Sequence, residues 1–182
     1  MCNYLELARA KYNQSTEADF DLEFSDFIMD CYVRLKPCSY GAKIQHKISL
    51  DVNIPSISPN ENKGDVILND KFAEIKTSYL GKNGGYRLTH LRMWQKFKYY
   101  IICFVDCEND FNPELYLIDK YIMDKFKLTP MNGTSHANSE NNNIELSCTI
   151  KKNSPNHNIL KKYNRLSGTT IYDLKDFVNK NN

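Results

Sequence analysis

The sequence lacks any long apolar run. Its longest uninterrupted apolar stretch, residues 99–105, is far shorter than the roughly 20 residues needed to cross a bilayer, so we expect no membrane partner. The first residues also lack the basic-then-apolar pattern of a secretion signal, which predicts a cytoplasmic protein. With 182 residues, 41% of them hydrophobic, the chain can build one core, and we expect a single domain over residues 1–182.

Closely spaced cysteines are also lacking. The six cysteines form no C-x-x-C pair and no zinc-ligand spacing, so we predict no metal held by cysteine. Cys31 and Cys103 fall in apolar stretches and are interpreted as buried, reduced thiols. The four histidines are dispersed as well, although His90 lies in a basic segment where it could meet a phosphate.

Acidic residues are missing between Glu74 and Asp106, although the net charge of the whole chain is only +2. Solvated faces usually mix both signs of charge, whereas a purely basic segment favours a polyanionic partner such as DNA. Residues 151–165 form a second segment without acids, which could grip a DNA backbone. The candidate DNA-binding residues in these two segments are Lys82, Arg87, His90, Arg92, Lys96, Lys151, Lys152, Lys161 and Lys162.

Two carboxylates precede the first basic segment. Asp65 is followed nine positions later by Glu74, and Val66 and Ile67 favour a strand between them. If residues 69–70, Asn-Asp, form the tip of a hairpin, Asp65 lies directly across from Glu74. Lys76 is two residues beyond Glu74, so the two side chains share one face of the strand.

Two carboxylates and a lysine on one patch are typical of the active site of a metal-dependent nuclease. Carboxylates hold a hard cation such as Mg²⁺, which neutralises charge that develops on a phosphodiester and activates a bound water. A nearby lysine can orient or deprotonate that water. The alternative is a surface hairpin with an ordinary salt bridge, because these residue types are common in turns.

These residues resemble the PD-(D/E)xK nuclease superfamily, and type II restriction endonucleases in particular. The resemblance covers about residues 41–106. It rests on the dipeptide at 64–65, on Glu74-Ile75-Lys76, and on the run 91–102, which looks like the helix and strand that follow the catalytic hairpin in this superfamily. Gln95-x-x-x-Tyr99 is similar to a Q-x-x-x-Y motif of recombination nucleases.

The resemblance implies a fold, a cofactor and roles for individual residues. The fold is an α/β restriction-endonuclease-like core with a central mixed sheet flanked by helices. Asp65, Glu74 and the carbonyl of Ile75 would bind Mg²⁺, with Mn²⁺ as a substitute. Lys76 would act on the attacking water, and Gln95 could touch the nucleophile or a phosphate.

The chain departs from the superfamily pattern at two positions. Gly64 stands where proline is the nominal residue, which is a frequent and harmless substitution. Gln45 stands on the predicted first helix, where many members place a glutamate near the metal.

The remaining pattern predicts an order of elements. Helices are expected at about 16–35, 41–50, 88–98, 119–128 and 170–178. Besides the hairpin, strands or extended segments are expected at 51–57, 100–105, 114–118 and 144–150. Residues 129–143 are rich in Asn, Ser, Gly and Thr and predict a long exposed loop, either a connector or a loop that reads DNA.

The sequence therefore predicts a Mg²⁺-dependent, site-specific endonuclease acting on double-stranded DNA, of the type II restriction kind. No nucleotide cofactor is expected. Cleavage of both strands by so small a chain implies a homodimer or a partner subunit. The catalytic core is expected at about 41–106 and the DNA-recognition region at about 129–165. Two alternatives stay open: a repair, recombination or structure-specific nuclease, and a non-catalytic DNA-binding protein on a decayed nuclease fold.

Overall fold

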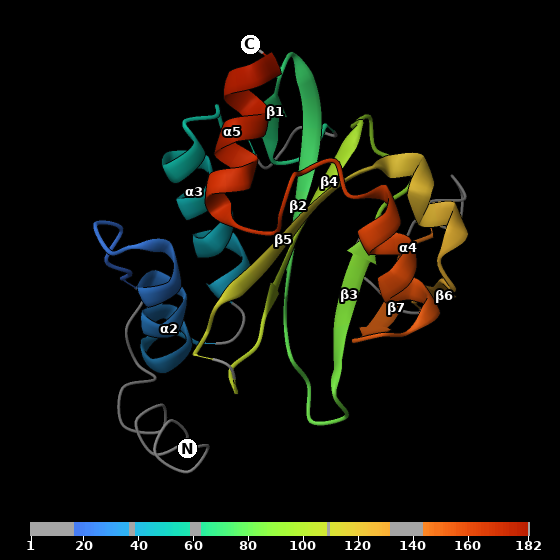
Figure 1. Cartoon of the computed structure of the whole chain (residues 1–182), viewed down its shortest axis with the longest axis horizontal. Coiled ribbons are helices and arrows are strands. Elements are labelled where there is room, and N and C mark those ends of the chain that lie inside the picture. Colours follow the sequence, from blue (N-terminus) through green and yellow to red (C-terminus); the bar gives the residue numbers. More distant parts are fainter. Residues whose placement is uncertain (1–16, 37–38, 59–62, 109, 132–143, 182) are drawn as a thin grey trace.

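A four-stranded mixed sheet forms the centre of the molecule (Figure 1). The computed structural model describes residues 17–36, 39–58, 63–108, 110–131 and 144–181. The sheet has the order β1 (Val66–Leu68), β2 (Lys71–Tyr79), β4 (Tyr99–Val105) and β5 (Pro113–Asp119). β2 and β4 are parallel, and the two outer pairs are antiparallel.

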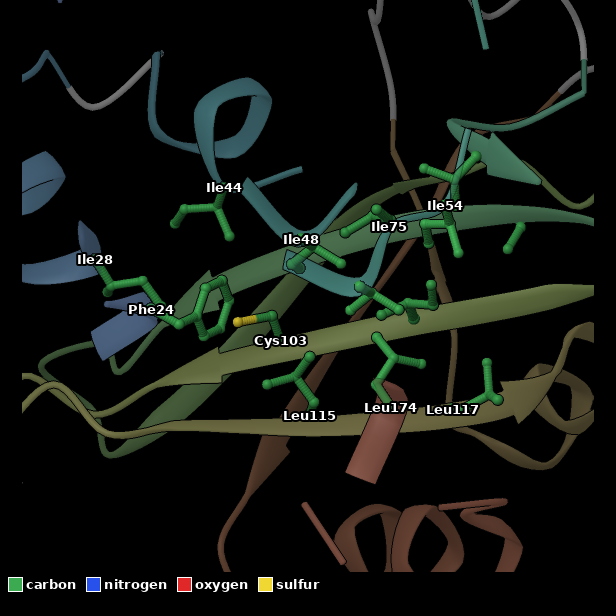
Figure 2. Packing of buried hydrophobic residues seen from close by; sticks show 14 of the residues in the cluster. Phe24, Ile28, Ile44, Ile48, Ile54, Ile75, Cys103, Leu115, Leu117 and Leu174 are labelled. Atoms are coloured by element: carbon green, nitrogen blue, oxygen red, sulfur yellow. The ribbon is translucent and has the colours of Figure 1, made fainter. Parts of the chain in front are cut away.

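Three helices cover one face of this sheet: α2 (Phe24–Arg34), α3 (Tyr40–Val52) and α5 (Ile171–Asn181). Their apolar side chains pack against alternate residues of the strands, as Figure 2 shows for Ile48 of α3, Leu174 of α5 and Cys103 of β4. Alternation along a strand places every second side chain on the same face.

A second layer covers the other face. It consists of a small sheet of β3 (Gly85–Leu91), β7 (Leu146–Lys151) and β6 (Thr129–Pro130), together with α4 (Pro155–Tyr163) and the 3₁₀ helix η2 (Lys120–Lys125). Tyr100, Ile102 and Phe104 of β4 face this layer, and the ring of Phe104 stacks on Tyr86 of β3 at 4.3 Å. Burial on both faces explains why β4 has a continuous apolar sequence.

The fold class predicted from the sequence, α/β with a mixed central sheet flanked by helices, is confirmed at that level. The strands expected at 100–105, 114–118 and 144–150 and the helices expected at 41–50 and 170–178 are present with small shifts of their ends. Within the described residues, the first helix begins at Phe24, and the predicted helix 119–128 is the shorter η2.

The predicted helix at 88–98 is wrong. Residues 85–91 form strand β3, and turns lead from there to β4. A bulge interrupts the β3–β7 pairing between Leu88 and Leu91, so both leucines point inward although they are three residues apart. That spacing imitates one turn of a helix, which accounts for the error.

One further prediction needs correction, and one helix was not predicted. The expected extended segment 51–57 is divided, because α3 continues to Val52 and ends at Asn53 in the left-handed conformation. After it, Ser56 forms a single bridge to Val66. The helix α4 was not anticipated, although Ser154 followed by Pro155 is a typical helix start.

The predicted loop 129–143 lies largely outside the described residues, which include only its first three positions. Among the helices that the structure describes, none has the length and apolar character needed to span a membrane.

Candidate active site

The hairpin that carries the candidate site is formed as predicted. β1 pairs with β2 in the register Val66 to Ala73, and Asn69 and Asp70 form the tip with φ values of 48° and 59°. Positive φ at both central residues is the geometry of the type I′ turn, one of the two common two-residue hairpin turns. Continued by one residue, the register sets Asp65 opposite Glu74.

Gly64 has a structural role at the start of this hairpin. Its φ is +99°, and a Cβ atom at this position would lie 2.6 Å from the carbonyl oxygen of Ala73. Proline fixes φ near −65°, so the nominal residue of the superfamily motif does not fit this backbone. The departure that looked harmless in the sequence is therefore a requirement of this particular hairpin.

The carboxylate of Asp65 is fixed by two neighbours. Its Oδ2 atom accepts hydrogen bonds from the backbone N–H of Ile75 at 2.7 Å and from Nε2 of Gln45 at 3.0 Å. The same Gln45 nitrogen donates to the carbonyl oxygen of Ile75 at 3.1 Å. Gln45 of α3 thus bridges two of the three groups that the resemblance implies as metal ligands.

Glu74 and Lys76 form an ion pair on the same face of β2. Lys76 Nζ lies 2.6 Å from Glu74 Oε1, and both side chains are largely buried. Ser78 continues this face and donates a hydrogen bond to the carbonyl oxygen of Arg87 in β3. The predicted convergence of Asp65, Glu74 and Lys76 at one hairpin is present.

Burial and like charge perturb the site electrostatically. Burial raises the pKa of Asp65 to about 6, and the nearby Glu74 carboxylate adds to the rise. The hydrogen bond from Ile75 and the charges of Lys76 and Arg92 oppose it. A carboxylate in a partly desolvated position beside another negative charge favours either a proton or a cation.

The donor set fits a hard divalent cation. The side chains of Asp65 and Glu74 and the carbonyl of Ile75 offer oxygen ligands, which Mg²⁺ prefers. Among the described residues no cluster of three or more His, Cys, Asp or Glu side chains could hold a metal ion. A metal here would therefore depend on two carboxylates, one backbone carbonyl and water.

Gln95 does not lie where the sequence placed it. It follows β3 in a turn, and its side chain is buried with an Oε1 atom that has no hydrogen-bond partner among the described residues. Its backbone carbonyl accepts a hydrogen bond from Lys120. No hydrogen bond within the described part of the chain connects its side chain to Asp65, Glu74 or Lys76.

The candidate DNA-binding residues divide into several groups. Arg92 acts electrostatically on Asp65. Both Arg92 and His90 contact Glu145. Glu145 was not among the predicted site residues, because nothing in its local sequence pattern marks it. Lys152 is paired with Asp106 at 3.0 Å, so its charge is partly neutralised. The other members are exposed: Lys82, Arg87, Lys96, Lys151, Lys161 and Lys162.

The second basic segment is divided between two places. Lys151, at the end of β7, is opposite Gly85 of β3, so it lies beside the first segment. Lys161 and Lys162 belong to α4, which contacts β5, β7 and η2. β5 is the edge of the central sheet opposite β1, the strand next to Asp65. That this segment grips DNA opposite the candidate active site stays a prediction.

No protein-family model matches the chain, and a comparison with curated proteins finds no match. Support for a function therefore comes from the geometry of the site.

Proposed function

We propose that this chain is a Mg²⁺-dependent endonuclease that hydrolyses phosphodiester bonds at specific sites in double-stranded DNA, on a restriction-endonuclease-like core. The observation that supports the proposal is the meeting of Asp65, the carbonyl of Ile75 and the Glu74–Lys76 ion pair at one hairpin. A hairpin that served only structure would have little reason to set the partly buried Asp65 beside the buried Glu74, because burial and a neighbouring negative charge disfavour the charged form of Asp65.

Each residue has a role in the proposed reaction. The ion would be held by Asp65, Glu74 and the Ile75 carbonyl. Gln45 keeps Asp65 and the Ile75 carbonyl in place through its hydrogen bonds to both. When bound, Mg²⁺ supplies charge neutralisation at the phosphate and a more acidic water. Lys76, held by Glu74, orients the attacking water and can exchange a proton with it.

The proposed substrate follows from the charge around the site. Arg92 lies close enough to Asp65 to lower its pKa, and exposed basic residues follow along β3 and its flanking turns, where no acid occurs. Phosphate neutralisation provides most of the non-specific affinity for DNA. Cleavage of both strands would require a second copy of the chain or a partner subunit.

The test is cleavage of a long, sequence-diverse DNA in Mg²⁺ by the native chain and by Lys76→Ala. Lys71→Ala is the matched control, because Lys71 lies on the same strand but is exposed. Discrete fragments from the native chain and the control, with none from Lys76→Ala, would support the proposal.

A smear that is lost in Lys76→Ala would favour a repair-type or non-specific nuclease. Absence of cleavage, with DNA binding retained, would favour a non-catalytic DNA-binding protein. Equal cleavage by the native chain and Lys76→Ala would rule out the catalytic assignment.

A further inference from the structure

A fully buried carboxylate holds two of the basic residues beside the candidate active site. Glu145 is 0% exposed, and its two oxygens contact Arg92 Nε and His90 Nδ1, each at 2.7 Å. Removing a carboxylate from water is costly unless charged or polar partners compensate for the lost hydration. The buried Glu145 carboxylate and its two basic partners lie next to the candidate site.

Within this cluster of Glu145, Arg92 and His90, the acid is shielded from solvent and the two basic side chains are partly exposed to it. The side chain of His90 is 48% exposed and that of Arg92 is 24% exposed, whereas Glu145 has no exposed surface. Arg92 uses Nε for Glu145, and none of the described residues accepts a hydrogen bond from its two terminal nitrogens. A guanidinium fixed in this way presents a pair of donors that match a phosphate.

The backbone is distorted where it delivers these side chains. The β3–β7 pairing shifts between Leu88 and Leu91, and His90 has a φ of 52° in the left-handed region. The His90 N–H points to Met131 Sδ at 3.3 Å and takes no part in the sheet. Bulges re-aim side chains, and a non-glycine residue keeps such a conformation only when its surroundings enforce it.

We infer that Arg92 and His90 form a binding site for a phosphodiester group of the DNA, next to Asp65, and that the buried Glu145 is the residue that positions them. The inference depends on the proposed function and extends it by assigning the phosphate contact and its support. Arg92 touches the substrate, and Glu145 acts through Arg92 and His90. Tyr100 of β4 is in register with Glu74, and its hydroxyl donates a hydrogen bond to Sδ of Met93, the residue after Arg92, at 3.8 Å, so this phosphate would lie beside the metal-binding groups.

The first test is the salt dependence of DNA binding by the double variant Arg92→Gln/Glu145→Gln. Both substitutions are neutral and can hydrogen-bond to each other, so no unpaired charge stays buried. Binding is measured in a Lys76→Ala background, where the DNA should stay intact. Loss of one phosphate contact should reduce the slope of log K against log salt concentration by about 1.

The matched control is Arg34→Gln/Asp30→Asn, which removes an arginine–carboxylate pair from α2 on the other face of the central sheet. It should leave the salt slope and cleavage unchanged. In a background with Lys76 intact, the Arg92→Gln/Glu145→Gln chain should cut DNA about 100-fold more slowly, the usual scale for losing one preorganised contact to a reacting group.

The second test is Glu145→Gln alone, which keeps the charge of Arg92 and releases its orientation. A positioning role predicts that the cleavage rate constant falls at least about tenfold while DNA binds as tightly as before or more tightly. Tighter binding with unchanged cleavage would make Glu145 a mere counter-charge and would overturn the inference. Should this variant fail to fold, the double variant still tests the phosphate contact, because an unchanged salt slope would overturn the inference.

Failure of the inference and failure of the proposed function give different results. If the native chain cuts DNA and Lys76→Ala does not, an unchanged salt slope and cleavage rate in Arg92→Gln/Glu145→Gln overturn the inference alone. If the native chain neither binds nor cuts DNA, both are overturned.

Discussion

The unfavourable ionisation of Asp65 predicts that a neutral replacement stabilises the fold at the expense of the site. In Asp65→Asn, the new amide oxygen can still accept the hydrogen bond from the Ile75 N–H, but no charge is buried. The pKa of Asp65 is raised from 3.8 to about 6, first by burial and then by Glu74. At about 1.4 kcal/mol per pKa unit, this rise corresponds to about 3 kcal/mol.

The sign follows from proton binding. A carboxyl group whose pKa is raised by folding binds its proton more tightly in the folded chain, so it favours folding at low pH. That contribution is fully present below pH 3.8 and is lost as the pH rises through about 6. The asparagine variant lacks this term. Its stability relative to the native chain should therefore increase by about 3 kcal/mol between about pH 3 and pH 7.

The assay is urea unfolding at a series of pH values, with a chelator present, followed by circular dichroism. The difference between the two free energies of unfolding is the quantity to compare, because titration of unrelated groups cancels. Asp70→Asn is the matched control, since it removes an exposed carboxylate from the tip of the same hairpin and should change stability little. A difference between Asp65→Asn and the native chain that is constant with pH, or that decreases toward neutral pH, would refute the reasoning.

Two further predictions concern the scaffold of the site. Gly64→Ala should lower the free energy of unfolding by about 3 kcal/mol, because φ is +99° and the added carbon would meet Ala73. Gly41→Ala on α3 is the control and should be neutral or slightly stabilising, because the space around Gly41 is open. Thermal unfolding compares the two variants. Phe104→Ala should lower the free energy of unfolding by about 3–5 kcal/mol, because the side chain is 1% exposed and its ring stacks on Tyr86. Tyr172→Ala is the control, since that side chain is 65% exposed, and equal stability of the two variants would contradict the prediction.

The hairpin could be predicted because its information is local. Asn69 and Asp70 are residues that tolerate the left-handed conformation, and this turn alone fixes which residue lies opposite Asp65. The pairing of Glu74 with Lys76 then follows from alternation along one strand. Strand β4 could be predicted for a similar reason, because a short continuous apolar run indicates burial on both faces.

The surroundings of the hairpin could not be predicted because they depend on contacts that are distant in sequence. Gln45 reaches Asp65 from α3 across 20 positions, and Glu145 reaches Arg92 across 53. The mistaken helix at 88–98 has the same origin, since the bulge that sets Leu88 and Leu91 inward exists only because β3 pairs with β7. Single-sequence patterns report periodicity, and a bulge alters the period without leaving a signal of its own.

The pairing of β3 with β7 also constrains how the chain can be made. Gly85 is opposite Lys151, so the pairing of β3 with β7 cannot be completed until residue 151 has left the ribosome. Until then, Tyr100, Ile102 and Phe104 lack the cover that Cys148 and Ile150 of β7 provide on that side of the central sheet. Such late, non-local closure slows folding and leaves nascent chains open to aggregation. Yield during expression should accordingly depend more on synthesis temperature and on chaperone supply than on the equilibrium stability of the finished molecule.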